Sequence, residues 1–142
     1  MRGPFQLVAY EPDEHELQIA CVKMLRTLLL PDVCWTAIDH GHSIDRTPSW
    51  RDPRVSVGFL EMQKRRARGV IDGIWDLWFW RVGITHVIEL KVGDNDLSSA
   101  QEEFGERLIL AGVRHLKVCW TQDQVFDAVC GWGLTRVANQ PP

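Results

Sequence analysis

The chain has 142 residues, of which 45% are hydrophobic, and its formal net charge is -3. This length suffices for one globular domain with a real core but not for two ordinary domains. No apolar run reaches the ~18 residues that a membrane span needs, and the start of the chain turns acidic before a signal-peptide core can form. We therefore expect a single domain over residues 1–142, without a membrane segment, in the cytoplasm. The weak net charge excludes a protein that coats nucleic acid by bulk electrostatics alone.

The first half of the chain predicts two helices and one strand. Apolar residues recur at helical spacing over residues 13–29 until Pro31 ends the pattern. The run CWTAIDH at 34–40 predicts a short strand. Residues 41–57 are rich in proline and polar residues and predict a long loop. A second helix is expected over about 55–69, although its first residues are weak helix formers.

The second half predicts a hairpin followed by alternating helices and strands. IWDLWFW and THVIELKV are rich in aromatic and β-branched residues and predict the two strands of the hairpin. Ser98 and Gln101 are spaced as a capping box at the start of a helix over 98–112. RHLKVCW predicts another strand, a last helix covers 122–131, and a tail covers 134–142. The order predicts a mixed α/β domain with a small central sheet.

The predicted hairpin brings acidic residues together. Side chains alternate along a strand, so Glu89 and Lys91 share one face. If the hairpin loop has two or four residues, Asp76 lies opposite Glu89, whereas three or five would shift this register. In the favoured register the two Cβ atoms are about 5 Å apart, and the carboxylates repel unless something neutralises them. A divalent cation such as Mg²⁺ would do so, since it takes carboxylate, carbonyl, water and phosphate oxygens.

Lys91 could then orient an attacking water and offset charge on a phosphate oxygen. The alternative is a surface hairpin on which Glu89 and Lys91 are solvated and Asp76 pairs with an arginine, because an E-x-K triplet alone is common.

A basic cluster precedes the hairpin. It contains Lys64, Arg65, Arg66 and Arg68 within QKRRARG. In isolation this cluster indicates a solvated helix face. Beside a site that acts on phosphate, it would hold the DNA backbone.

Five segments form an ordered set: GIWD at 73–76, IELK at 88–91, LSSAQ at 97–101, the helix end LILAG, and the strand LKVCW. Taken together, they resemble the VRR-NUC type of the PD-(D/E)xK nuclease superfamily. The resemblance extends from about residue 14 to 120, within a motif-bearing core of about 14–130. It implies a restriction-endonuclease-like core with the order helix, strand, strand, strand, helix, strand (αβββαβ) around a mixed central sheet.

The resemblance also implies the roles of individual residues. Asp76, Glu89 and the backbone carbonyl of Leu90 would bind Mg²⁺ or Mn²⁺, Lys91 would be the catalytic lysine, and Gln101 would be the motif glutamine.

In this family an N-terminal helix donates a further glutamate to the metal site. We assign this role to Glu14, which shares a helix face with Gln18. Glu11 and Glu16 remain alternatives.

The sequence departs from the family pattern at two places. Trp75 stands where the family usually has a proline before the aspartate, and DHG at 39–41 replaces a frequent asparagine-glycine pair. His40 could take over a substrate contact, but we expect His40 and His42 to be loop histidines.

By resemblance, the function is that of a metal-dependent DNA endonuclease that hydrolyses phosphodiester bonds. Relatives of this type imply selectivity for branched DNA, such as a Holliday junction, a homodimer, and a bacterial or phage-infected cell as the setting. The alternative is a non-catalytic nucleic-acid-binding or protein-interaction module that retains the nuclease fold.

Overall fold

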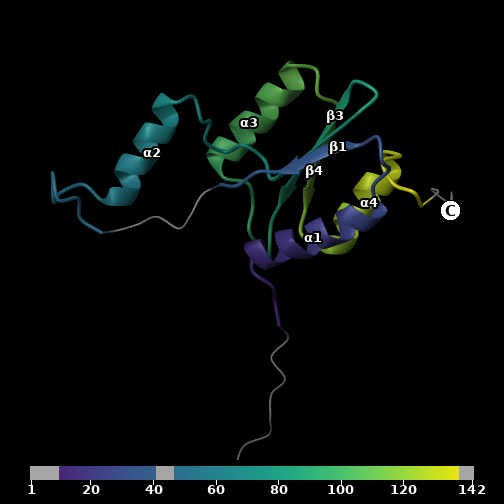
Figure 1. Cartoon of the computed structure of the whole chain (residues 1–142), viewed down its shortest axis with the longest axis horizontal. Helices are drawn as coiled ribbons and strands as arrows, with labels where there is room; N and C mark the ends of the chain where they lie inside the picture. Colours follow the sequence, from purple (N-terminus) through teal and green to yellow (C-terminus); the bar gives the residue numbers. More distant parts are fainter. Residues whose placement is uncertain (1–9, 41–46, 138–142) are drawn as a thin grey trace, which may run out of the picture.

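The computed structural model describes residues 10–40 and 47–137, in which a four-stranded mixed sheet has helices on both faces (Figure 1). Expectations for residues 1–9, 41–46 and 138–142, including His42 and part of the predicted tail, lie outside the described residues. Among the described helices, none combines the length and apolar character needed to cross a bilayer.

The predicted order of elements is confirmed. In chain order they are α1 (Glu14–Leu28), β1 (Cys34–Ala37), α2 (Val57–Ala67), β2 (Leu77–Arg81), β3 (Ile84–Leu90), α3 (Ser99–Leu110), β4 (His115–Cys119) and α4 (Gln122–Gly131). The capping box of Ser98 and Gln101 is present at the start of α3. The chain is therefore an α/β protein.

The strands lie in the order β1, β2, β3, β4. β1 pairs with β2 and β2 with β3 in antiparallel fashion, whereas β3 pairs with β4 in parallel. A parallel pair needs a crossover connection, which α3 supplies between β3 and β4. The sheet is consequently mixed, which is compatible with the central sheet that the resemblance implies.

A two-residue turn sets the register of the central hairpin. Val82 and Gly83 connect β2 to β3, and both have positive φ angles, 51° and 72°, as in a type I′ turn. The strands then pair from Arg81 with Ile84 down to Leu77 with Ile88. This is the register of the two-residue loop considered above, and it brings Asp76, just before β2, to the end of β3.

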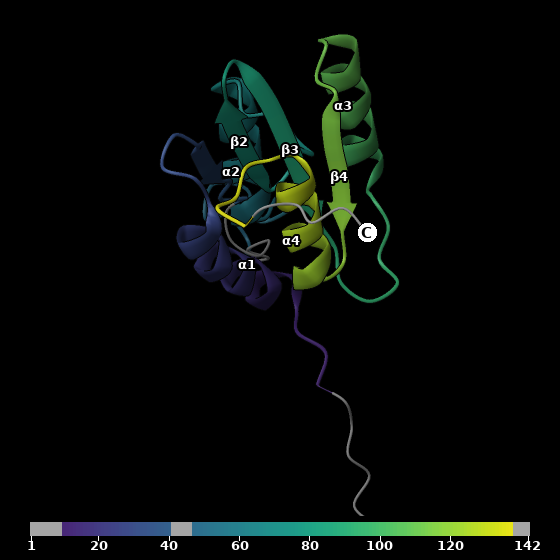
Figure 2. The ribbon, with the colours of Figure 1, turned by 90° about the vertical axis from the view of Figure 1, so that its right-hand side faces the viewer.

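The core is divided between the two faces of the sheet. α1 and α4 lie side by side on one face, and α3 covers the other (Figures 1 and 2). On the first face, Leu17 and Leu25 of α1 pack with Ile88 and Leu90. On the second face, a separate cluster surrounds Val87. Burial of each large apolar side chain stabilises the fold by about 1.5–3 kcal/mol, so β3 is held from both sides.

α2 differs from the other helices because none of its residues is buried. It begins after the N-cap Ser56, whose hydroxyl accepts a hydrogen bond from the amide of Phe59. In Figure 1 it lies beyond the edge of the sheet, away from α1 and α4. The sequence predicts this helix but not its position outside the core.

The turn contains a residue that is poorly suited to its conformation. Val82 is β-branched and 84% exposed, and its backbone is in the left-handed region, which disfavours residues other than glycine, asparagine and aspartate. We predict that Val82→Asn and Val82→Gly each stabilise the protein, Asn by about 1 kcal/mol, because Asn-Gly is the preferred type I′ pair. Urea unfolding would measure the gain. The control Val82→Ala supplies neither the conformational freedom of glycine nor the short polar side chain of asparagine, so it should gain less. Equal gains in all three variants would contradict this explanation.

Candidate metal and active site

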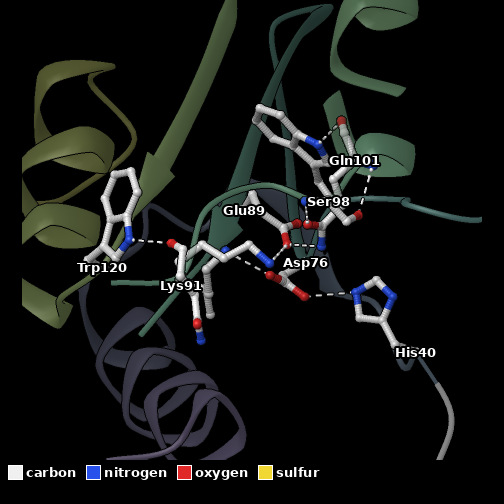
Figure 3. A network of polar contacts seen from close by, with 10 residues as sticks. His40, Asp76, Glu89, Lys91, Ser98, Gln101 and Trp120 are labelled. Carbon is white, nitrogen blue, oxygen red and sulfur yellow. Dashed lines mark hydrogen bonds and ion pairs between the residues drawn. The ribbon is translucent and has the colours of Figure 1, made fainter. Parts of the chain in front are cut away.

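Four elements converge where β3 ends (Figure 3). Glu89 is near the end of β3, and Lys91 is the first residue after that strand. Asp76 precedes β2, whose antiparallel pairing with β3 places its start beside that end. The first turns of α1 and α3 contribute Glu14 and Gln101. The site is therefore built on regular elements rather than on long loops.

The three charged residues from the hairpin are removed from solvent. Asp76 is 2% exposed, Glu89 0% and Lys91 7%. Burial of a charge is costly unless the charge is paired and hydrogen-bonded. The surface hairpin considered as an alternative, with solvated Glu89 and Lys91, is therefore not what the structure has.

Asp76 has a partner for each carboxylate oxygen. The peptide N–H of Leu90 donates to Oδ2 over 2.7 Å, and Nε2 of His40 lies 2.7 Å from Oδ1. His40 is thus more than the loop histidine that we expected, since it connects the end of the β1 segment to Asp76. This bond holds the backbone N–H of Leu90 at the site, while the ligand role of the Leu90 carbonyl stays a prediction.

Glu89 is only half satisfied. Its Oε1 lies 3.3 Å from Nζ of Lys91 and accepts a short hydrogen bond from Nε2 of Gln101. Its Oε2 is buried and has no hydrogen-bond partner among the residues that the structure describes. Among the described residues the other such side-chain atom is Nδ1 of His86, which packs against His115 and Trp132. Oε2 of Glu89 is thus a buried acceptor that lacks a donor or a cation.

The electrostatic environment of Glu89 is unfavourable for its charged form. Burial, followed by the neighbouring charge of Asp76, raises the pKa of Glu89 well above its ordinary value of 4.5, while Lys91 acts in the opposite direction. Desolvation and like charge are the two usual causes of such an increase. Lys91 alone therefore does not compensate for two adjacent buried carboxyl groups.

Glu14 completes an acidic trio with Asp76 and Glu89. One carboxylate oxygen from each residue lies within 4.8 Å of the others. Of the other candidate glutamates, Glu16 is used elsewhere, because it forms a capping box with Asp13 at the start of α1. The Asp-x-x-Glu spacing was a signal that the sequence analysis missed, and it would have removed Glu16 from the candidates.

Gln101 belongs to both the start of α3 and the site. Its Oε1 accepts a hydrogen bond from the peptide N–H of Ser98 over 2.9 Å, which completes the capping box. The amide group can then only present its Nε2 to Glu89. The cap thereby determines which atom of Gln101 faces the carboxylate.

Trp75 contributes to the site through packing. Its Nε1 donates to the backbone carbonyl of Gln101 over 3.0 Å, and its ring packs against Gly105 of α3. Gly73 approaches α3 so closely that a Cβ there would be 2.3 Å from the carbonyl carbon of Ala100. These contacts, which sequence reasoning missed, hold the segment before Asp76 against the first turns of α3.

Several side chains of the basic cluster already have partners within the protein. Lys64 pairs with Glu61 at 3.3 Å, and Arg66 pairs with Asp72 at 2.5 Å. Arg65 donates to the backbone carbonyl of His40 over 3.0 Å. Arg68 follows α2 as its C-cap. The arginine–carbonyl contact connects α2 to the site, whereas two of the four cations already have acidic partners.

The close approach at Gly73 gives a test of how the site is held. Gly73 and Gly69 both have positive φ angles, 75° and 85°, but a Cβ at Gly69 would meet no described atom within 4 Å. We predict that Gly69→Ala costs about 1–2 kcal/mol from backbone strain alone. Gly73→Ala should cost at least twice as much, because the backbone of α3 would have to move. Urea unfolding measures both costs, and equal values would show that the contact with Ala100 is not restrictive.

Searches with this chain found no matching family model, no matching curated protein and no matching solved structure. The geometry of the site is therefore the main evidence for what the protein does.

Proposed function

We propose that this protein is a Mg²⁺- or Mn²⁺-dependent nuclease with a restriction-endonuclease-like core that hydrolyses DNA phosphodiester bonds. The observation that supports this most directly is the acidic trio of Glu14, Asp76 and Glu89, next to Lys91. Three adjacent carboxyl groups are compensated by protons or by cations, and Lys91 provides a single positive charge, so a divalent cation would supply the rest when all three are ionised. The element order and mixed sheet are compatible with such a core.

The residues of the trio fit a hard divalent cation. Mg²⁺ and Mn²⁺ prefer carboxylate and carbonyl oxygens. Glu14, Asp76 and Glu89 would hold the ion, and the unpartnered Oε2 of Glu89 is a ready ligand atom. We include the carbonyl of Leu90 in the ligand set because the neighbouring N–H of the same residue already bonds Asp76.

The chain's own residues would divide the remaining work. A bound ion would supply Lewis-acid stabilisation of charge on the phosphate oxygens. Lys91, whose ammonium group lies beside Glu89, would orient the attacking water and offset negative charge that develops during the in-line displacement. Gln101 would keep Glu89 oriented through its amide, and His40 would do the same for Asp76.

Further features of the proposal rest on the resemblance to VRR-NUC nucleases. They are endonucleolytic cleavage, a preference for branched DNA such as Holliday junctions, a homodimer, and action in the cytoplasm of a bacterial or phage-infected cell. Arg65 and Arg68 would contact the DNA backbone together with Lys64 and Arg66, whose acidic partners are on the surface and exchangeable. α2 buries none of its residues and so has surface available for a second subunit.

Glu89→Gln tests the metal site through stability. In metal-free protein the raised pKa of Glu89 means that the folded state binds more protons than the unfolded state above about pH 4.5, so stability falls as pH rises from there through neutral pH. The variant lacks this carboxyl and should exceed wild type by on the order of 1–3 kcal/mol at pH 8, but by little at pH 5. Urea unfolding in EDTA at several pH values measures this difference.

The metal response should change in the opposite direction. Saturating Mg²⁺ or Mn²⁺ should stabilise wild type by about 3 kcal/mol at 100 times the dissociation constant, and Glu89→Gln by much less. Glu103→Gln, an exposed position on α3, is the control and should behave as wild type. The metal site is refuted if both glutamine variants respond to metal equally.

Lys91→Ala and Lys91→Met test the chemistry. We expect both variants to lose metal-dependent cleavage by at least 100-fold, because positioned charge at the reacting group contributes about that much or more. A labelled panel of linear duplex, single strand, flap and four-way junction would measure cleavage with Mg²⁺ or Mn²⁺. Lys91→Met keeps the aliphatic part of the buried side chain, and circular dichroism would confirm that both variants are folded.

Lys117→Ala, an exposed lysine on β4, is the matched control and should cleave as wild type does. Equal cleavage by wild type and both Lys91 variants would refute the mechanism. If no protein cleaves any substrate while all bind DNA, the non-catalytic binding module becomes the better description.

A further inference from the structure

A groove extends from the acidic trio along α1. It has a volume of about 910 Å³ and lies between α1 and the segment that follows β1. One end contains Glu14 and Asp76 of the trio, together with His40. The other end is lined by Lys23 and Arg26. Because Glu14 and Asp76 belong to both, the groove is continuous with the proposed catalytic site.

The charge along α1 changes sign within this groove. Glu14 is at the start of the helix, and Lys23 and Arg26 follow in its second half. Glu14 and Arg26 are twelve positions apart, a rise of about 18 Å. The ~3.4 Å rise per nucleotide applies to a strand stacked in a duplex, and an unpaired strand is more extended, so this span corresponds to about five nucleotides at most.

Lys23 and Arg26 are exposed, and neither forms an ion pair or side-chain hydrogen bond within the described part of the chain. This distinguishes them from Lys64 and Arg66 of α2, which have acidic partners. Cations near the end of a helix also favour its dipole, which is a purely structural explanation for Arg26. Both residues also line the groove, so a role in binding a ligand there can be tested against the structural explanation.

The apolar part of the groove lining favours a single strand over a duplex. It consists of Ile19, Val22, Ala37 and Ile38, and Ile19 is 44% exposed. Apolar surface next to cations suits unpaired bases whose phosphates contact those cations, as in other single-strand sites. A duplex keeps its base faces stacked inside and would leave this apolar surface uncovered.

We propose that this groove binds a single-stranded stretch of the DNA next to the scissile phosphate, with Lys23 and Arg26 on its phosphates. The inference rests on the proposed nuclease function and assigns its substrate contacts. It implies that an unpaired strand, as at a flap or an opened junction, enters along α1.

The test is the binding of a labelled single-stranded DNA oligonucleotide in EDTA, where no cleavage occurs, over a series of salt concentrations. We expect Lys23→Ala/Arg26→Ala to bind roughly tenfold more weakly than wild type and to reduce the slope of log K against log salt by about 1.4, or ~0.7 for each lost phosphate contact. Arg107→Ala/Lys117→Ala removes the same two charge types outside the groove and should leave both quantities unchanged. The same strand annealed into a duplex should bind more weakly than the single strand.

Two results would overturn the inference. One is that Lys23→Ala/Arg26→Ala binds the oligonucleotide with wild-type affinity and salt slope. The two cations would then have only a structural role at the end of the helix, which would show as a change in unfolding free energy. The other is tighter binding of the duplex than of the single strand. Neither result depends on cleavage, so the nuclease proposal is judged separately by the Lys91 variants.

Discussion

The carboxyl groups of Asp76 and Glu89 are buried side by side, and their mutual repulsion is the constraint on which the rest of the site depends. Two adjacent buried carboxylates cost free energy unless hydrogen bonds and cations compensate. The hairpin forces this proximity, because its two-residue turn fixes the pairing of β2 with β3. Every polar neighbour of the pair can be understood as a response to that cost.

The response is uneven in a way that indicates function. Asp76 has a donor or ring nitrogen at each oxygen, so its orientation is settled by the protein alone. Within the described part of the chain, Glu89 has two donors on one oxygen and none on the other. A purely structural pair would be expected to satisfy all four oxygens, or to be replaced by apolar residues. The unsatisfied oxygen of Glu89, a member of the acidic trio, therefore favours an ion ligand over a structural ion pair.

Sequence reasoning was successful where the signals are local. Helical spacing, the capping box at Ser98 and the hairpin run predicted the elements. Strand alternation predicted that Asp76 and Glu89 meet only on the condition of a two- or four-residue loop, and the structure has the two-residue loop. It failed where the contact depends on the packing of distant segments. The His40–Asp76 contact spans 36 positions and the Trp75–Gln101 bond spans 26, and no local pattern encodes either. The position of α2 outside the core could not be predicted for the same reason, because its sequence shows a helix but not its neighbours.

The double use of Gln101 has a consequence for which sequences this site tolerates. A capping box accepts glutamate as readily as glutamine, since either side chain offers an oxygen to the N-cap amide. Here the amide nitrogen of Gln101 faces Glu89, and a glutamate at position 101 would replace it with a negative oxygen and add a fourth carboxylate to the acidic trio. Local folding rules thus permit an exchange that the electrostatics of the site forbid. A variant with that exchange could keep its helix and its fold while losing the neutral donor on which the orientation of Glu89 depends, so stability screening alone would pass a protein with a damaged site.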